Sequence, residues 1–267
     1  MPCNGDDVLT FETPEEIVEA IRKEAAVLAR PFTALIAPGK TSTDLTESRF
    51  GGAAVRTSIE DWPLCFDGRP MTFLTQINCQ VAPMPPGFPK TGLLQFFVKD
   101  DPVEIYDAPL GGGAAVRHVQ SFENLRAVAQ PKPDDRDSPY TGPVEGLALR
   151  FETGTMRPDP YGAELRWLSS LFQAGEDKYP DGLSEEFDAD VPSRTYLGGF
   201  PRSTQGFRNE PDEPDLEDSE ELAVTLLQIG SGEGFMWGDL GEASFMLSDQ
   251  DLRDRKFERA DFNWDCH

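Results

Sequence analysis

A pattern that occurs twice along this chain constrains its fold more than any other feature of the sequence. Each copy begins with a glycine pair, continues with an apolar run carrying a Gln-Ile pair, and ends with a second apolar run introduced by glycine. The copies span residues 48–100 and 196–252. Because short apolar runs bounded by turn residues are typical of buried strands, the pattern predicts an internal duplication, with two related halves built on neighbouring strands.

The repeated residues are candidates for a structural motif or for a pocket. Glycine pairs fit backbone positions with positive φ or close chain approach. A glutamine inside an apolar strand needs hydrogen-bond partners when it is buried, and two such glutamines could instead line a shared cavity; we favour the structural interpretation. Together with a tryptophan at a Trp-Pro turn, these residues are Gly51, Gly52, Trp62, Gln76, Gly198, Gly199 and Gln228.

The N-terminal part contains the clearest helix signal. Thr13 is a suitable cap, Pro14 suits the first helical position, and apolar residues recur on one face up to Leu28. Pro31 should end this helix, and residues 32–37 read as a strand. We therefore expect residues 1–47 to form an N-terminal helix and strand, and residues 48–267 to form the duplicated domain, all in one compact globule.

The excess of acidic residues limits the kinds of molecule that this chain can bind. Lys and Arg number 24 against 48 Asp and Glu, for a net charge of −24. Such a field repels phosphate backbones and anionic lipids, so we expect neither nucleic acid nor membrane as a partner. A basic protein would be attracted, although a generic acidic cytoplasmic protein has the same charge.

The cysteines and the termini favour a reducing compartment. None of the four cysteines forms a Cys-x-x-Cys pair, and their spacing fits no zinc template. The N-terminus lacks a signal-peptide apolar stretch, and no run approaches the length of a membrane span. We predict a cytoplasmic location, free thiols, and no metal or other cofactor.

Two short motifs suggest chemistry only weakly. His118 is the only internal histidine, and no nucleophile motif accompanies it. Residues 34–41 end in Gly-Lys-Thr after an apolar run, as a phosphate-binding loop does. However, Pro38 removes an amide donor beside the lysine, and no amphipathic helix pattern follows. We interpret this segment as a surface loop.

At the repeated residues, the chain resembles the YwqG-like family of uncharacterised bacterial proteins over about residues 48–264. The match is carried by Ser48–Gly52, Trp62-Pro63, Gly68–Ile77 and Gly92–Phe97, and in the second half by Leu197–Pro201, Gln205, Leu226–Ile229, Trp237–Asp239 and Phe245. Ala53–Val55 departs from the family, which usually has a proline there. The resemblance implies an α+β fold, mainly antiparallel sheet, built from two related halves.

Some members of that family look like immunity proteins encoded beside secreted toxins, including nucleases delivered by type VI secretion. The leading hypothesis is therefore an immunity protein, not an enzyme, that binds a basic nuclease toxin through an acidic surface. The candidate contact residues are Glu210, Asp212, Glu213, Asp215, Glu217, Asp218, Glu185, Glu186 and Asp188.

Two other functions stay open. One is a small-ligand-binding module with a pocket between the two halves, near Gln76 and Gln228. The other is an enzyme that uses carboxylates, which requires a pocket holding at least two acids with perturbed pKa values.

Overall fold

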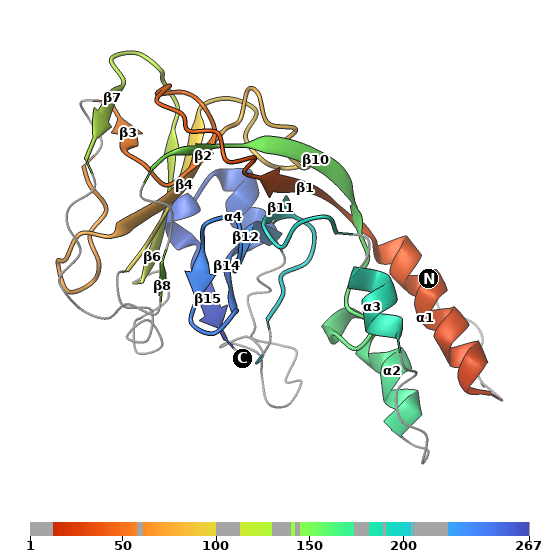
Figure 1. Cartoon of the computed structure of the whole chain (residues 1–267). Coiled ribbons are helices and arrows are strands. Elements are labelled where there is room, and N and C mark those ends of the chain that lie inside the picture. Colours follow the sequence, from red (N-terminus) through yellow and green to blue (C-terminus); the bar gives the residue numbers. More distant parts are fainter. Residues whose placement is uncertain are drawn as a thin grey trace. The chain divides into compact units, whose positions relative to one another are not determined.

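The computed structural model describes residues 13–57, 61–99, 113–129, 140–141, 145–173, 182–188, 191–203, 205 and 224–266 (Figure 1). This part of the chain is mostly antiparallel sheet with four α-helices, one of them N-terminal. The chain divides into two compact units, Met1–Arg30 with Thr155–Asp190, and Pro31–Gly154 with Val191–His267. The division predicted from the sequence, into residues 1–47 and 48–267, stays a prediction.

The first unit is helical. It contains α1 (Pro14–Leu28), α2 (Arg166–Gln173), α3 (Leu183–Asp188) and a 3₁₀ turn at Ala163–Leu165. Thr13 caps α1, because its Oγ1 accepts a hydrogen bond from the Glu16 amide at 3.3 Å. The apolar face predicted for α1 packs into a small core that consists of Ile17, Ile21, Ala25, Leu165, Leu168, Leu183 and Phe187.

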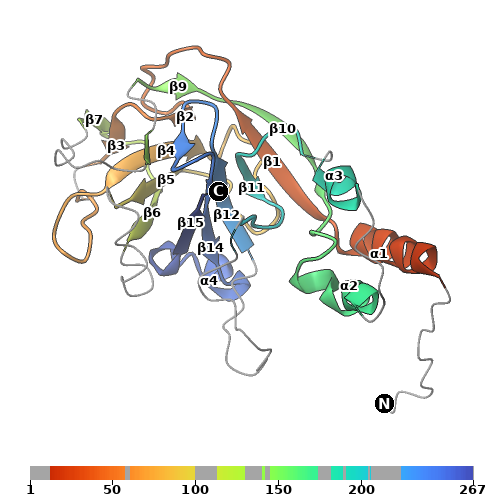
Figure 2. The same cartoon turned by 60° about the horizontal axis from the view of Figure 1, so that its bottom comes forward.

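The second unit contains two larger sheets (Figure 2). The six-stranded sheet has the order β10 (Arg150–Met156), β1 (Arg30–Ile36), β11 (Tyr196–Gly198), β12 (Val224–Gly230), β14 (Glu242–Leu247) and β15 (Asp261–Asp265). The five-stranded sheet has the order β6 (Ala114–Val119), β5 (Leu93–Val98), β4 (Thr72–Asn78), β2 (Arg49–Phe50) and β9 (Leu147–Ala148).

Smaller elements complete the described part of this unit. Strand β3 (Ala54–Arg56) pairs with β7 (Arg126–Val128), and β8 (Tyr140–Thr141) pairs with β13 (Met236–Trp237). Helix α4 (Asp249–Asp254) was not predicted from the sequence. Its N-cap is Ser248, whose Oγ accepts a hydrogen bond from the Asp251 amide at 3.1 Å. A 3₁₀ turn at Phe257–Arg259 follows it. None of the described helices is long and apolar enough to cross a membrane.

One apolar core joins the two large sheets. Phe96 of β5 meets Phe245 of β14 edge-on, with ring centroids 5.2 Å apart. Phe50 of β2 meets Phe235 in the same way at 4.9 Å. All of these rings are nearly or fully buried, so this aromatic contact fixes the spacing between the sheets.

The strand registers place the repeated glutamines in matching surroundings. The β4–β5 ladder has an irregularity between Phe73 and Thr75, just before Gln76. The β12–β14 ladder has one between Thr225 and Leu227, just before Gln228. Each irregularity allows the strand to bend before it presents its glutamine.

Both glycine pairs adopt the positive φ that their sequence predicted. The φ angles are 61° and 74° at Gly51 and Gly52, and 74° and 66° at Gly198 and Gly199. At Gly198, a Cβ atom would lie 2.7 Å from the Pro31 carbonyl oxygen. Residues other than glycine are therefore disfavoured at position 198 by both the backbone angle and the neighbouring Pro31 carbonyl group.

We predict that Gly198→Ala lowers the free energy of unfolding more than Gly39→Ala does. The two glycines have similar φ angles, +74° and +78°, but Gly39 has nothing within 4 Å of an added Cβ. Gly39→Ala should cost about 1–2 kcal/mol from the left-handed backbone alone, and Gly198→Ala a further ~1–3 kcal/mol from overpacking. Urea unfolding followed by tryptophan fluorescence measures both, and equal losses would contradict the packing argument.

Candidate functional site

A row of polar side chains crosses the five-stranded sheet on neighbouring strands. Gln76 on β4, Gln95 on β5 and Arg117 on β6 are register partners. Gln95 Nε2 donates to Gln76 Oε1 at 3.1 Å, and Arg117 Nε and Nη2 donate to Gln95 Oε1 at 2.9 and 2.7 Å. The two glutamines are fully buried, so these bonds satisfy groups that water cannot reach.

The same row fixes loop segments against the sheet. Gln76 Nε2 donates to the carbonyl oxygens of Leu45 and Glu47, both at 2.9 Å. Gln95 Nε2 donates to the Val55 carbonyl oxygen, also at 2.9 Å. The glutamine amides therefore hold the chain on either side of the first glycine pair, which is a structural role.

Gln228 has a parallel role in the six-stranded sheet. Its Oε1 accepts from the Arg202 amide at 3.1 Å, and its Nε2 donates to the Arg202 carbonyl oxygen and to Glu242 Oε2, both at 3.2 Å. Arg202 follows the second glycine pair in sequence. Gln228 therefore pairs with that backbone as a neighbouring strand would.

Two buried carboxylates lie beside Gln228. Glu242 on β14 and Asp265 on β15 are register partners, and their residues are only 6% and 3% exposed. Burial raises the pKa of Glu242, and the charge of Asp265 raises it further, while Arg194 and Arg202 oppose the change. Asp265 accepts hydrogen bonds from Ser203 Oγ and, at 3.1 Å, from the Gln205 amide. The acid pair thus anchors the segment that follows Gly199.

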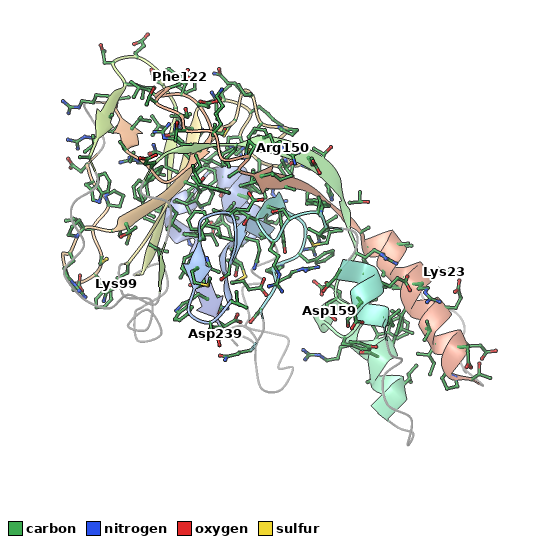
Figure 3. The ribbon with its side chains drawn as sticks, viewed as in Figure 1. Lys23, Lys99, Phe122, Arg150, Asp159 and Asp239 are labelled. Carbon is green, nitrogen blue, oxygen red and sulfur yellow. The ribbon has the colours of Figure 1, made fainter. Side chains whose placement is uncertain are left out.

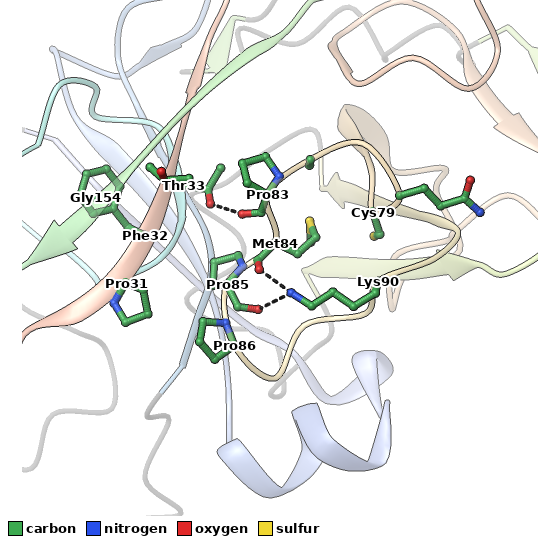
Figure 4. Close-up of a pocket in the computed structure, with 13 residues that line it drawn as sticks. Pro31, Phe32, Thr33, Cys79, Pro83, Met84, Pro85, Pro86, Lys90 and Gly154 are labelled. Carbon is green, nitrogen blue, oxygen red and sulfur yellow. Dashed lines mark hydrogen bonds between the residues drawn. The ribbon is translucent and has the colours of Figure 1, made fainter.

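A pocket of about 470 Å³ lies elsewhere in the second unit, against the proline-rich loop between β4 and β5 (Figure 4). Strands β1 and β10 form its opposite wall. Thr33 Oγ1 donates to the Pro83 carbonyl oxygen at 2.5 Å and so ties the loop to β1. The lining residues are Pro31, Phe32, Thr33, Cys79, Gln80, Ala82, Pro83, Met84, Pro85, Pro86, Lys90, Thr153 and Gly154.

The chemistry of this pocket is mainly apolar. Of the described residues that line it, none is acidic, and Lys90 is the one with a charged side chain. Burial raises the pKa of the Cys79 thiol to about 11, so the thiol stays protonated and weakly nucleophilic at neutral pH. The carboxylate-enzyme hypothesis called for a pocket with two perturbed acids, and this pocket does not provide one.

The predicted pocket residues differ in their distance from this cavity. Gly198 lies against Pro31 and Pro85 of its lining, and the Gly199 amide donates to the Pro31 carbonyl oxygen at 3.1 Å. Neither Gln76 nor Gln228 contacts the cavity, because each is turned toward backbone groups of the loops described above. Trp62 is a packing residue: its Nε1 donates to the Met71 carbonyl oxygen at 2.9 Å, and its ring meets Phe97 edge-on at 5.6 Å.

Three of the predicted acidic contact residues lie on α3, and the other six lie outside the described residues. Glu185 and Asp188 are exposed on α3. Glu186 is instead paired with Arg22 at 2.8 Å and with Arg157 at 3.1 Å, and hydrogen bonds from these arginines lower its pKa. The acids of the 209–221 run, Glu210, Asp212, Glu213, Asp215, Glu217 and Asp218, lie outside the described residues.

The two weak motifs of the sequence have structural roles. His118 Nε2 lies 2.8 Å from the Thr91 carbonyl oxygen, and its ring meets Phe257 edge-on at 5.6 Å. Thr41 bridges to Leu147, and no helix follows it within residues 42–57. Of the segment 34–41, residues 34–36 are the end of strand β1, and residues 38–41 are exposed, as expected for a surface loop. Within the described ranges, no group of three or more His, Cys, Asp or Glu is placed to hold a metal ion.

Sequence reasoning missed the residues with the most distinctive surroundings. Lys90 ends the proline-rich loop of residues 81–90, and no motif in the sequence marks it as a pocket residue. Glu242 and Asp265 lie in strands whose neighbours are largely buried, and acids within such strands are a signal that can be read from sequence. That the two acids are register partners required the strand pairing.

Comparison with protein-family models identifies the family of this chain. A family model described as a domain of unknown function, DUF1963, matches residues 48–266. The chain belongs to the DUF1963 family. The matched region contains both glycine pairs, both glutamines, the acid pair and every pocket residue except those from β1. No curated protein matches the chain. The narrower YwqG-like assignment stays a prediction for this DUF1963 protein.

We predict that Glu242→Gln stabilises the DUF1963 protein at pH 7–8 and that the gain shrinks as the pH falls. An acid whose pKa is raised in the folded state binds its proton more tightly there than in the unfolded chain. Wild-type stability therefore falls as the pH rises from the ordinary value for Glu, 4.5, through the raised value. Melting temperatures between pH 5 and 8 measure this.

The amide in Glu242→Gln keeps an oxygen that can accept from Gln228, so the hydrogen bond survives while the charge is removed. The matched control is Glu258→Gln, at an exposed carboxylate. A melting-temperature difference for Glu242→Gln that is independent of pH would contradict the assigned pKa shift.

Proposed function

We propose that this DUF1963 protein is a cytoplasmic immunity protein that binds and neutralises a cognate toxin, a basic nuclease delivered by type VI secretion. The observation that carries the proposal is the net charge of −24, from 48 acids against 24 bases. A nuclease presents a positive cleft to its substrate's phosphates. An acidic protein can be steered to that cleft quickly and can occupy it.

Several buried polar side chains of the second unit hydrogen-bond to the protein itself, which supports a binding role rather than catalysis. The buried glutamines bond to loop backbone and to each other, and Asp265 accepts hydrogen bonds from Ser203 and Gln205. Much of the remaining charge is at the surface, where Asp159 and Asp239 are exposed examples (Figure 3). Exposed carboxylates are suited to long-range attraction of a basic partner.

Co-expression tests the proposal directly. The product of the neighbouring gene is expressed alone and together with this protein in the same cells. We expect growth arrest with the neighbouring product alone and normal growth with both, since a bound inhibitor blocks the nuclease. A neighbouring product that is harmless alone, or that stays toxic in the presence of this protein, would overturn the proposal.

We predict that neutralising the 209–221 run slows association with the toxin. The variant replaces six acids by their amides, which removes much of the local field, and the association rate should fall about tenfold or more at low salt. Stopped-flow fluorescence at two salt concentrations measures it. The replaced residues are Glu210, Asp212, Glu213, Asp215, Glu217 and Asp218.

The matched control changes the net charge equally at six exposed acids outside the run, and it should slow association much less. Equal slowing by the two variants would show that net charge, not the run, steers the toxin. The control residues are Glu15, Glu19, Glu123, Glu145, Asp239 and Glu258.

A second candidate function is a small-ligand-binding module. It is favoured by the 470 Å³ pocket, a volume typical of small-molecule sites. This pocket is formed by β1, β10 and the β4–β5 loop, at a place different from the one expected near Gln76 and Gln228. The two functions rest on different residues, namely acidic side chains for the first and the pocket lining for the second.

We also infer that the two large sheets derive from a duplicated unit. Three features support this. Each glycine pair follows or ends a short strand, β2 or β11, that pairs beside the glutamine strand. Each glutamine follows a ladder irregularity. Each glutamine amide holds loop backbone near a glycine pair.

A further inference from the structure

Lys90 lies at the edge of the pocket, where its ammonium contacts backbone carbonyl groups. Its ammonium donates to the carbonyl oxygens of Met84 at 2.5 Å and Pro85 at 3.4 Å (Figure 4). Among the described residues, no carboxylate lies within ion-pair distance of Nζ. An ammonium has three N–H groups, so these carbonyls leave one donor and the full positive charge for a ligand.

The loop around Lys90 supplies few other donors. Pro83, Pro85 and Pro86 have no backbone N–H. The carbonyl oxygens of Pro83 and Pro85 already accept hydrogen bonds, from Thr33 and from Lys90. The charged donor that lines the pocket is the Lys90 ammonium, at one end of it. A charged donor of this kind favours an anionic group on the ligand.

The rest of the pocket favours an apolar group. Its walls carry pyrrolidine rings, the Phe32 ring and the Met84 side chain, and Phe32 and Met84 are buried. The volume of about 470 Å³ suits a small molecule rather than a folded partner. A ligand that satisfies both ends has an apolar body and a single anionic head.

We propose that this pocket binds a small amphipathic carboxylate, with its carboxylate at Lys90 Nζ and its apolar body against the prolines and Phe32. The proposal rests on the second candidate function, ligand binding, and is independent of toxin neutralisation. The net charge of −24 repels free anions at long range. Binding of an anion therefore depends on the local ammonium, which makes the charge requirement testable.

Three ligands with the same apolar chain separate the contributions of body and head. Octanoate, octanol and octylammonium are titrated into the full-length protein, and binding is measured by isothermal titration calorimetry. We expect octanoate to bind about tenfold or more tightly than octanol, the gain typical of one charge-assisted hydrogen bond. Octylammonium should bind more weakly than either, because its charge repels that of Lys90.

Two variants assign the binding to the pocket. Lys90→Met keeps the length of the side chain but removes its charge, and should lower octanoate affinity to that of octanol. Thr153→Trp places a large ring on the exposed wall residue of β10, and should weaken both ligands. Lys40→Met is the matched control, an exposed lysine that does not line the pocket, and should change neither.

The outcomes distinguish the proposal from the function on which it rests. If octanol binds as tightly as octanoate and Thr153→Trp abolishes both, the ligand-binding function stands and the carboxylate proposal fails. If none of the three ligands binds, the proposal fails; if a thermal-shift screen of small metabolites also gives no shift, the ligand-binding function fails as well. Should Lys90→Met not fold, as judged by circular dichroism, Lys90→Gln takes its place.

Discussion

The central strands of the second unit are buried on both faces, and the rest of this unit's structure depends on that constraint. Every residue of β4, β5 and β14 is buried, and in β12 only the first is not. One face packs into the aromatic core between the sheets. The other face is covered by loops, whose backbone amides and carbonyls need partners. Gln76, Gln95 and Gln228 supply some of those partners, which explains why glutamines occupy buried positions in these strands.

This arrangement limits where function can lie. Side chains that satisfy buried loop backbone are not available to a ligand, and replacing them would leave unpaired polar groups. The chemistry that remains is at the surface, as carboxylates, and in the pocket, as Lys90 beside apolar walls. The two proposals therefore rest on different residues, a basic partner on the carboxylates and a small amphipathic anion on Lys90.

The proline-rich loop shows how local sequence and long-range contact combine. Its prolines exclude it from the sheet, since they cannot donate to a ladder. That much follows from residues 81–90 alone. The pocket exists only because Thr33 ties the loop to β1, and because β10 lies beside β1 in the sheet order. These strands are more than a hundred residues apart along the chain.

The sequence by itself determined the local structure of this protein. It predicted helix α1 with its Thr13 cap, the apolar runs that form β4 and β5, and the positive φ of the glycine pairs. These features depend on neighbouring residues, on periodicity and on backbone sterics. Only the tertiary structure decided that Glu242 faces Asp265 and that Glu186 is paired with two arginines. Such facts depend on contacts between distant segments, which no local pattern in the sequence encodes.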